Sequence, residues 1–326
     1  MGTSAPGSVI LLLAAGMAQA SEQNRPDLEG TWDFGTRTPW QRPAALGNKR
    51  AYTDAEAAEL ENKARRENLR KEAPIDLTQN APAVGGTIGE EADEMAMDRR
   101  HELTRVDGEY RTSIIIDPPD GRIPRRKEFV DHYGQLAARN IRNTDGPETL
   151  EAPTRCLQPL PVPSIFPMPW SALMQIVQTD DYVVLHTEMF HDARIVPLNA
   201  RHARRGWSTW MGESIGRYEG QTLVIHTIDF RPEQSYAAIL PMSGDFELTE
   251  RFTRTGPDEI LYSFTIVDPN AYTGPVTGER TLKRADPGEH ILEFACHEGN
   301  YAMTGILAGA RKQEQDQPAK DAPARK

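Results

Sequence analysis

Histidines and glutamates in three parts of the chain are the candidate acid–base groups. His186 and Glu188 occupy alternate positions of a β-branched run, so on a strand they would project to the same side. A histidine beside a carboxylate can act as a general acid or base, with a pKa set by its partner. The alternative is a strand face that is simply wetted by solvent.

His191 extends this pair to an H-x-E-x-x-H spacing. On a strand, positions 186 and 191 fall on opposite faces unless a bulge intervenes, so the three side chains would not converge on a metal ion. The helical zinc motif, with histidines at i and i+4, does not occur. Glycine-rich phosphate loops, G-x-S-x-G elbows and zinc ribbons do not occur either. We therefore predict neither a metal site nor a cofactor.

Glu250 and His297 complete the predicted catalytic set. Glu250 has the same strand parity as Leu248 and Phe252, so we expect it to face inward. A buried charge is costly unless it is paired, so Glu250 should have a partner or a function. His297 follows the last expected strand, where binding groups gather on rigid scaffolds. The alternative for His297 is a structural role in capping the turn.

A second set of polar and aromatic residues is predicted to bind substrate. Arg217, flanked by glycines, could clamp a carboxylate with two hydrogen bonds. The alternative is a tight hairpin in which Arg217 pairs with Glu219. Tyr272 follows a strand in a loop that could overhang a barrel mouth. The full predicted binding set is Trp210, Arg217, His226, Tyr272 and Tyr301.

Strands in the C-terminal half must position these residues. The β-rich segments here follow one another closely along the chain, with no helices between them. This order favours an antiparallel meander that forms a barrel or strongly curved, lipocalin-like sheet. The expected strands are 28–32, 112–116, 173–178, 182–190, 194–198, 206–211, 214–218, 222–230, 246–254, 259–267, 279–284 and 290–295.

The N-terminal third is expected to add a few helices packed on the barrel. Thr53 and Glu56 form a capping box that opens a helix towards residue 73, and shorter helices are possible at 90–101 and 126–141. The Pro-rich stretch 153–169 would either coat the core or form one wall of a pocket. We predict one β-rich domain over residues 21–311 and a disordered tail over 312–326.

The N-terminus and the cysteines indicate a compartment. An apolar stretch at 9–17 precedes Ala18-Gln19-Ala20, which predicts a signal peptide over residues 1–20 and a periplasmic or secreted protein. The stretch is too short to span a bilayer, and the alternative is a frayed tail. In an oxidising compartment Cys156 and Cys296 would be joined; the alternative is two separate buried thiols.

The net charge of -11 argues against binding to nucleic acid or to an anionic membrane. We therefore expect a small-molecule ligand or substrate and no membrane span; the sequence carries no signal for an oligomeric state.

Several motifs in order resemble a family of exported bacterial proteins that are generally labelled hypothetical. They are Asp120-Gly121-Arg122-Ile123-Pro124, His191-Asp192-Ala193-Arg194, Trp210-Met211-Gly212, Gly216-Arg217-Tyr218-Glu219-Gly220, Glu250-Arg251-Phe252-Thr253-Arg254 and Cys296-His297-Glu298-Gly299-Asn300-Tyr301. The resemblance covers residues 110–311. It implies secretion and a β-rich body, and it brings no mechanism.

Three functions are compatible with these residues. The preferred hypothesis is a cofactor-independent lyase that uses His/Glu acid–base chemistry for elimination, decarboxylation or deformylation of a small molecule, with an aromatic one favoured. The first alternative is a periplasmic small-molecule binding or carrier protein. The second is a metal-dependent hydrolase.

Overall fold

The structure is a computed structural model that describes residues 25–71, 101–162, 165–166, 172–203, 206–234 and 239–316. The predicted signal peptide lies outside these residues, as does most of the possible helix at 90–101. None of the described helices is long and apolar enough to cross a membrane.

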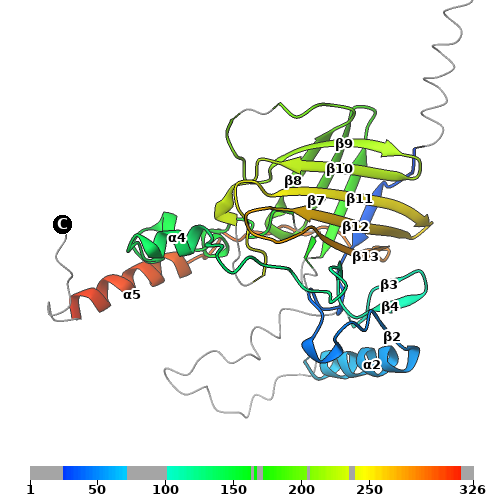
Figure 1. Cartoon of the computed structure of the whole chain (residues 1–326), viewed down its shortest axis with the longest axis horizontal. Helices are drawn as coiled ribbons and strands as arrows, with labels where there is room; N and C mark the ends of the chain where they lie inside the picture. The colour runs from blue at the N-terminus through cyan, green and yellow to red at the C-terminus, as the bar shows by residue number, and fades with distance from the viewer. Residues whose placement is uncertain are drawn as a thin grey trace, which may run out of the picture.

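A ten-stranded antiparallel sheet curls into a nearly closed barrel (Figure 1). The predicted fold class is therefore confirmed. Going round the barrel, the strands are β8 (Ala193–Pro197), β7 (Tyr182–Thr187), β6 (Leu173–Gln178), β1 (Gly30–Asp33), β13 (Val276–Arg284), β12 (Glu259–Val267), β11 (Glu247–Gly256), β10 (Thr222–Ile228) and β9 (Glu213–Glu219), with β5 (Ile115–Asp117) paired to β13.

The two end strands of this path meet at a parallel seam. Leu198, just after β8, forms a parallel bridge with Gly216 of β9. The amide of Asn199 donates to the Gly216 carbonyl at 2.7 Å. Because every other pairing on the path is antiparallel and the path holds an odd number of strands, its two ends must run in the same direction.

The inner face of the sheet carries the hydrophobic core, which follows from period-2 alternation along the strands. In β12 the side chains of Ile260, Tyr262, Phe264 and Ile266 are buried, and those between them are partly exposed. Opposite Phe264, position 278 must be glycine, because a Cβ there would lie 2.3 Å from the Phe264 Cζ.

A small second sheet and a helix lie beside the barrel (Figure 1). The sheet has the order β2 (Ala51–Tyr52), β4 (Glu109–Arg111) and β3 (Arg105–Val106). Helix α2 (Asp54–Lys71) contacts β2 and opens with the predicted capping box, in which Thr53 Oγ1 accepts from the Glu56 amide at 3.3 Å. Arg111 joins this sheet to the barrel through an ion pair with Glu279 at 2.6 Å.

Short helical elements complete the chain. They are α4 (His132–Ala138), α5 (Ala302–Asp316), and the 3₁₀ turns η1 (Ala44–Leu46), η2 (Pro147–Thr149), η3 (Ala152–Arg155), η5 (Met189–His191) and η6 (Pro232–Gln234). The expected helix over 126–141 is therefore limited to the seven residues of α4.

Two predicted strands and part of the predicted tail differ in the structure. Residues 206–211 form bends and a turn, with Thr209 in an isolated bridge to Phe230, and the glycines at either end of the stretch, Gly206 and Gly212, have positive φ. Residues 290–295 form no strand, since both edges of β13 are already paired. Positions 312–316, predicted to be disordered, belong to α5. Ion pairs one helical turn apart, including Lys312–Asp316 at 2.7 Å, support the end of this helix.

Candidate functional site

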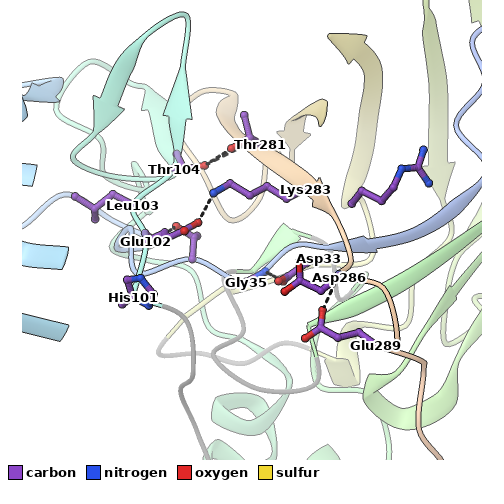
Figure 2. A pocket seen from close by; sticks show the side chains of 12 residues that line it. Asp33, Gly35, His101, Glu102, Leu103, Thr104, Thr281, Lys283, Asp286 and Glu289 are labelled. Atoms are coloured by element: carbon purple, nitrogen blue, oxygen red, sulfur yellow. Dashed lines mark hydrogen bonds and ion pairs between the residues drawn. The ribbon is translucent and has the colours of Figure 1, made fainter. Parts of the chain in front are cut away.

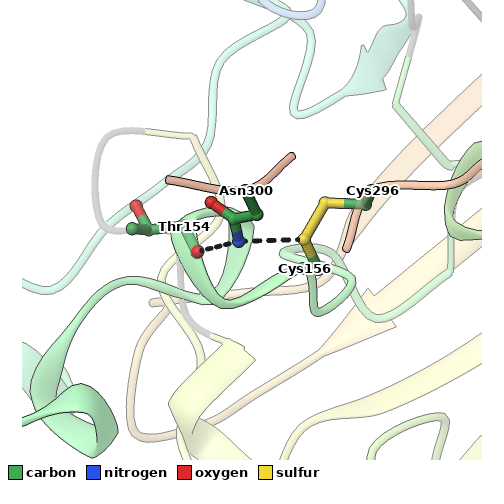
Figure 3. The surroundings of a disulfide bond; sticks show 4 residues. All are labelled: Thr154, Cys156, Cys296 and Asn300. Carbon is green, nitrogen blue, oxygen red and sulfur yellow. Dashed lines mark hydrogen bonds between the residues drawn. A yellow bond between two sulfur atoms is a disulfide. The ribbon is translucent and has the colours of Figure 1, made fainter. Parts of the chain in front are cut away.

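Cys156 and Cys296 form a disulfide, as the sequence predicted (Figure 3). The bond joins the end of η3 to the segment that follows β13, across a sequence separation of 140 residues. The Asn300 side-chain amide donates to the Thr154 carbonyl at 3.1 Å and lies 3.3 Å from the Cys156 sulfur. Such bonds persist in oxidising compartments, so the disulfide is compatible with an extracellular protein.

The two candidate residues beside this disulfide face solvent. His297 is exposed, and the side chain of Tyr301 is 81% exposed. The structure places neither of them beside Glu250, the predicted catalytic residue that lies in the barrel interior.

His186 faces the outside of the barrel, whereas we expected it inside. The inward-facing positions of β7 are Val183, Leu185 and Thr187, which are all buried, and His186 lies between them on the half-buried outer face. The strand also ends at Thr187, so Glu188 belongs to the following turn.

His191 lies against His186, although the sequence placed the two on opposite faces. Their rings are 4.5 Å apart in an edge-to-face arrangement. The reason is the turn η5, in which Phe190 and His191 both have a φ of 56° and bend the chain back. Two consecutive non-glycine residues in this conformation cannot be read from the sequence.

Residues next to these histidines contact the C-terminal segment. Glu188 Oε2 accepts from the Leu292 amide at 3.3 Å, and the ring of Phe190 lies 5.0 Å from that of Phe294. In the part of the chain that the structure describes, no group of three His, Cys, Asp or Glu side chains is arranged to hold a metal ion. The contacts that the structure shows for this cluster are those with the C-terminal segment.

Asp192 should make the protein less stable as the pH rises. Burial raises the pKa of its carboxyl to about 6, with His191 acting in the opposite direction. Its Oδ2 has no hydrogen-bond partner among the described residues. A raised pKa in the folded state contributes stability below about pH 4, which is lost as the pH rises through about 6.

We expect Asp192→Asn to remove this contribution. Between about pH 4 and pH 7, urea midpoints of the wild-type protein should fall relative to those of the variant. A difference between the two proteins that stays constant over this range would contradict the assignment.

Arg217 adopts the hairpin alternative. Its side chain is 54% exposed and pairs with Glu219 at 2.6 Å, and Glu219 also meets Arg251 at 3.0 Å. These two arginines hold the pKa of Glu219 below its ordinary value. The three side chains form a surface ion-pair cluster outside the barrel.

His226 is also outside the barrel, in a pair of histidines. A ring nitrogen of His202 lies 2.9 Å from His226 Nδ1, and Glu247 lies 3.7 Å from His226 Nε2. The sequence pattern gave no sign of His202, because it comes from a loop.

Trp210 and Tyr272 are bound to the backbone of neighbouring loops. The indole N–H of Trp210 donates to the Gln158 carbonyl at 2.9 Å. The Tyr272 hydroxyl is buried and donates to the Pro241 carbonyl at 2.5 Å, and burial raises its pKa. Tyr272 therefore packs inside the loop region, where we expected it to overhang a barrel mouth.

Glu250 faces the barrel interior and is paired, as its strand parity predicted. Its side chain is fully buried. Arg194 Nη1 donates to Glu250 Oε2 at 2.5 Å, and the Tyr262 hydroxyl donates to Oε1 at 3.0 Å. Arg194 and Tyr262 were not among the predicted site residues, although both lie at inward positions of predicted strands. The interior thus holds a hydrogen-bonded arginine, carboxylate and phenol.

A second interior arginine, Arg280 of β13, is also fully buried. Its Nη1 donates to the carbonyls of Phe34 and Phe166 at 3.0 and 3.2 Å. The guanidinium lies 5.2 Å from the Phe34 ring centre and 5.7 Å from that of Tyr262. Burial lowers its pKa to about 10, so it remains charged at neutral pH. Nε and Nη2 have no hydrogen-bond partner among the described residues.

Trp40 brings another buried donor to the same region. Its ring packs on Phe264 and on Phe166, with centroid distances of 5.6 and 5.5 Å. The indole N–H has no hydrogen-bond partner within the described ranges. The rings here are linked by contacts to one another and to Arg280, and we call them the aromatic cluster: Phe34, Trp40, Phe166, Tyr262 and Phe264.

A polar surface pocket of about 170 Å³ lies where β1 and β13 meet the chain before β3 (Figure 2). Its side chains bond to one another and to the backbone: Lys283 pairs with Glu102, Thr104 and Thr281 hydroxyls lie 3.3 Å apart, and Asp33 accepts from the Gly35 amide at 2.7 Å. These bonds hold the small sheet against the barrel, so we assign the pocket a structural role.

Comparisons with known proteins identify no family. No protein-family model, no curated protein and no solved structure matches the chain. The resemblance of its motifs to exported bacterial proteins therefore stays a prediction, and the case for a function rests on the residues of the barrel interior.

Proposed function

We propose that this protein binds a small aromatic molecule against the aromatic cluster in the barrel. The observation that carries the proposal is the set of buried donors without partners at Arg280 and Trp40. Buried polar groups are hydrogen-bonded in more than about 90% of cases, so exceptions inside the barrel call for a missing partner. A bound molecule that accepts hydrogen bonds would be that partner.

The rings of the cluster favour an aromatic molecule. Trp40 already packs on Phe264 and Phe166 within 5.6 Å, which is the spacing of favourable ring contacts. A flat ligand in contact with these rings would gain about 0.5–1.5 kcal/mol for each aromatic pair beyond the burial of its area.

Binding is favoured over histidine-based catalysis because the predicted catalytic residues lie in separate places. His186, Glu188 and His191 surround a turn outside the barrel, and His297 is exposed beside the disulfide. Glu250 alone lies in the interior. The carrier alternative thus fits the observed positions better than a lyase that needs these histidines.

One contact supports a lyase as the second candidate. Tyr262 donates to Glu250 and also lies against Arg280, so a phenol and a carboxylate that can exchange a proton border the aromatic cluster. Under this version Tyr262→Phe would keep ligand binding and abolish turnover. Equal substrate turnover by the Tyr262→Phe variant and the wild type would contradict a lyase that uses Tyr262.

A periplasmic or secreted location is part of the proposal. The disulfide supports it, together with the apolar stretch and the small-residue cleavage pattern at the N-terminus.

Benzyl alcohol should bind the full chain more tightly than cyclohexylmethanol, by about 2- to 10-fold, because only the aromatic probe gains ring contacts. Calorimetric titration measures both affinities. Phe166→Leu should reduce this preference. The matched variant Phe294→Leu changes a ring outside the barrel and should retain it. Equal affinity for the two alcohols, or an equal effect of the two variants, would contradict the proposal.

A further inference from the structure

The two arginines inside the barrel differ in their direct partners. Two guanidinium groups, Arg194 and Arg280, are buried there, and Glu250 is paired with Arg194. No carboxylate in the described part of the chain forms an ion pair with Arg280. Asp33 is buried and its charge favours the charged form of Arg280, but the two side chains form no ion pair. A buried charge is costly unless it is paired, so Arg280 lacks, among the described residues, a carboxylate in direct contact with its guanidinium.

The free edge of Arg280 has the shape that recognises a carboxylate. Nη1 is used for the two carbonyls, of Phe34 and Phe166, and these bonds fix the plane of the guanidinium. Nε and Nη2, the two atoms left without partners, lie on one edge of that plane. Their two parallel N–H groups form a fork that matches the two oxygens of a carboxylate.

The third unpartnered atom, Trp40 Nε1, is also a donor. Arg280 and Trp40 both contact Phe166, one through its carbonyl and the other through its ring. Guanidinium and indole nitrogens carry only donors. A ligand that satisfies all three atoms must therefore present acceptors at this end.

We infer that the ligand is an aromatic monocarboxylate, whose carboxylate lies on the Nε–Nη2 edge of Arg280 and whose ring lies against the aromatic cluster. This inference rests on the proposed binding function and adds the chemical class of the ligand. The carboxylate would supply the missing direct partner, and Trp40 Nε1 would donate a further hydrogen bond to one of its oxygens.

Benzoate and benzamide test the inference because they have nearly the same shape and differ in charge. In calorimetric titrations of the full chain, we expect benzoate to bind about 10- to 100-fold more tightly, as for hydrogen bonds to charged groups. Arg280→Gln should remove this preference. Arg251→Gln, which loses the same charge from the outer face of the next-but-one strand, should retain it.

Trp40→Phe keeps a ring and removes the buried donor, so it gives a second test if Arg280→Gln does not fold. It should weaken benzoate binding about 3- to 10-fold, and the urea midpoint of the free protein measures separately what the smaller ring costs in stability. Equal binding of benzoate and benzamide by the wild type would overturn the carboxylate inference and leave aromatic binding in place. If benzoate, benzamide and benzyl alcohol all fail to bind, both proposals are overturned.

Discussion

Glu250→Ala is expected to lower the free energy of unfolding by about 3–5 kcal/mol, because it leaves Arg194 as a buried charge without its partner. The Tyr262 hydroxyl also loses its acceptor, which adds to the cost. Urea unfolding of the protein with its disulfide intact measures the change. The effect should be the largest of any single substitution of an acidic residue in the barrel.

Two further variants separate the buried pair from a general effect of losing a carboxylate. Glu247→Ala removes an acidic side chain of the same strand that is 54% exposed, and it should cost less than about 1 kcal/mol. The double variant Glu250→Leu with Arg194→Met should recover most of the lost stability, because no buried charge remains. If Glu250→Ala costs no more than Glu247→Ala, the interior ion pair does not hold the barrel together.

Removal of the disulfide by Cys156→Ser with Cys296→Ser is expected to lower the free energy of unfolding by about 2–5 kcal/mol. The bond closes a loop of 140 residues, and in the chain-entropy model such a long loop places the cost at the upper end. The other contacts of the segment after β13 include ones at exposed positions, such as the Glu188–Leu292 hydrogen bond and the Arg142–Glu314 ion pair. That segment should therefore become the first site of limited proteolysis.

Reduction of the wild-type protein should reproduce the behaviour of the double variant. The serine variant should itself be insensitive to the reductant, which controls for other effects of the treatment. If the variant has the wild-type urea midpoint and the same proteolytic pattern, other contacts hold the C-terminal segment and the disulfide does not stabilise the fold.

Period-2 alternation made the barrel predictable from the sequence. In β11 the alternation placed Glu250 inward with Leu248 and Phe252, and the structure confirms it. The pair of cysteines in a chain with an export pattern predicted the disulfide. Both predictions rest on local pattern or composition, so they did not require long-range packing to be known.

Features that depend on distant contacts could not be predicted. β1 pairs with β6 and β13, far along the chain, and no local pattern encodes such a pairing. The turn η5 bends His191 back onto His186 through two left-handed residues that are not glycine. Trp40 comes from a loop, and only tertiary packing brings it to Phe264 and Phe166.

Unlike these features, the inward position of Arg280 was indicated by the sequence. Arg280 has the same strand parity as Leu282 and Gly278, both of which are buried, so an inward-facing arginine follows from the predicted strand 279–284. The sequence could not predict that Nη1 donates hydrogen bonds to two backbone carbonyls and that Nε and Nη2 are left without hydrogen-bond partners among the described residues.

A crystal structure of the full chain soaked with benzoate tests the central claim most directly. We expect a planar ligand in the barrel, with both carboxylate oxygens within about 3 Å of Nε and Nη2 of Arg280 and the ring in contact with Trp40 and Phe166. If protein groups or water occupy that edge of Arg280 at saturating benzoate, the barrel interior is a structural core and the proposed ligand site does not exist.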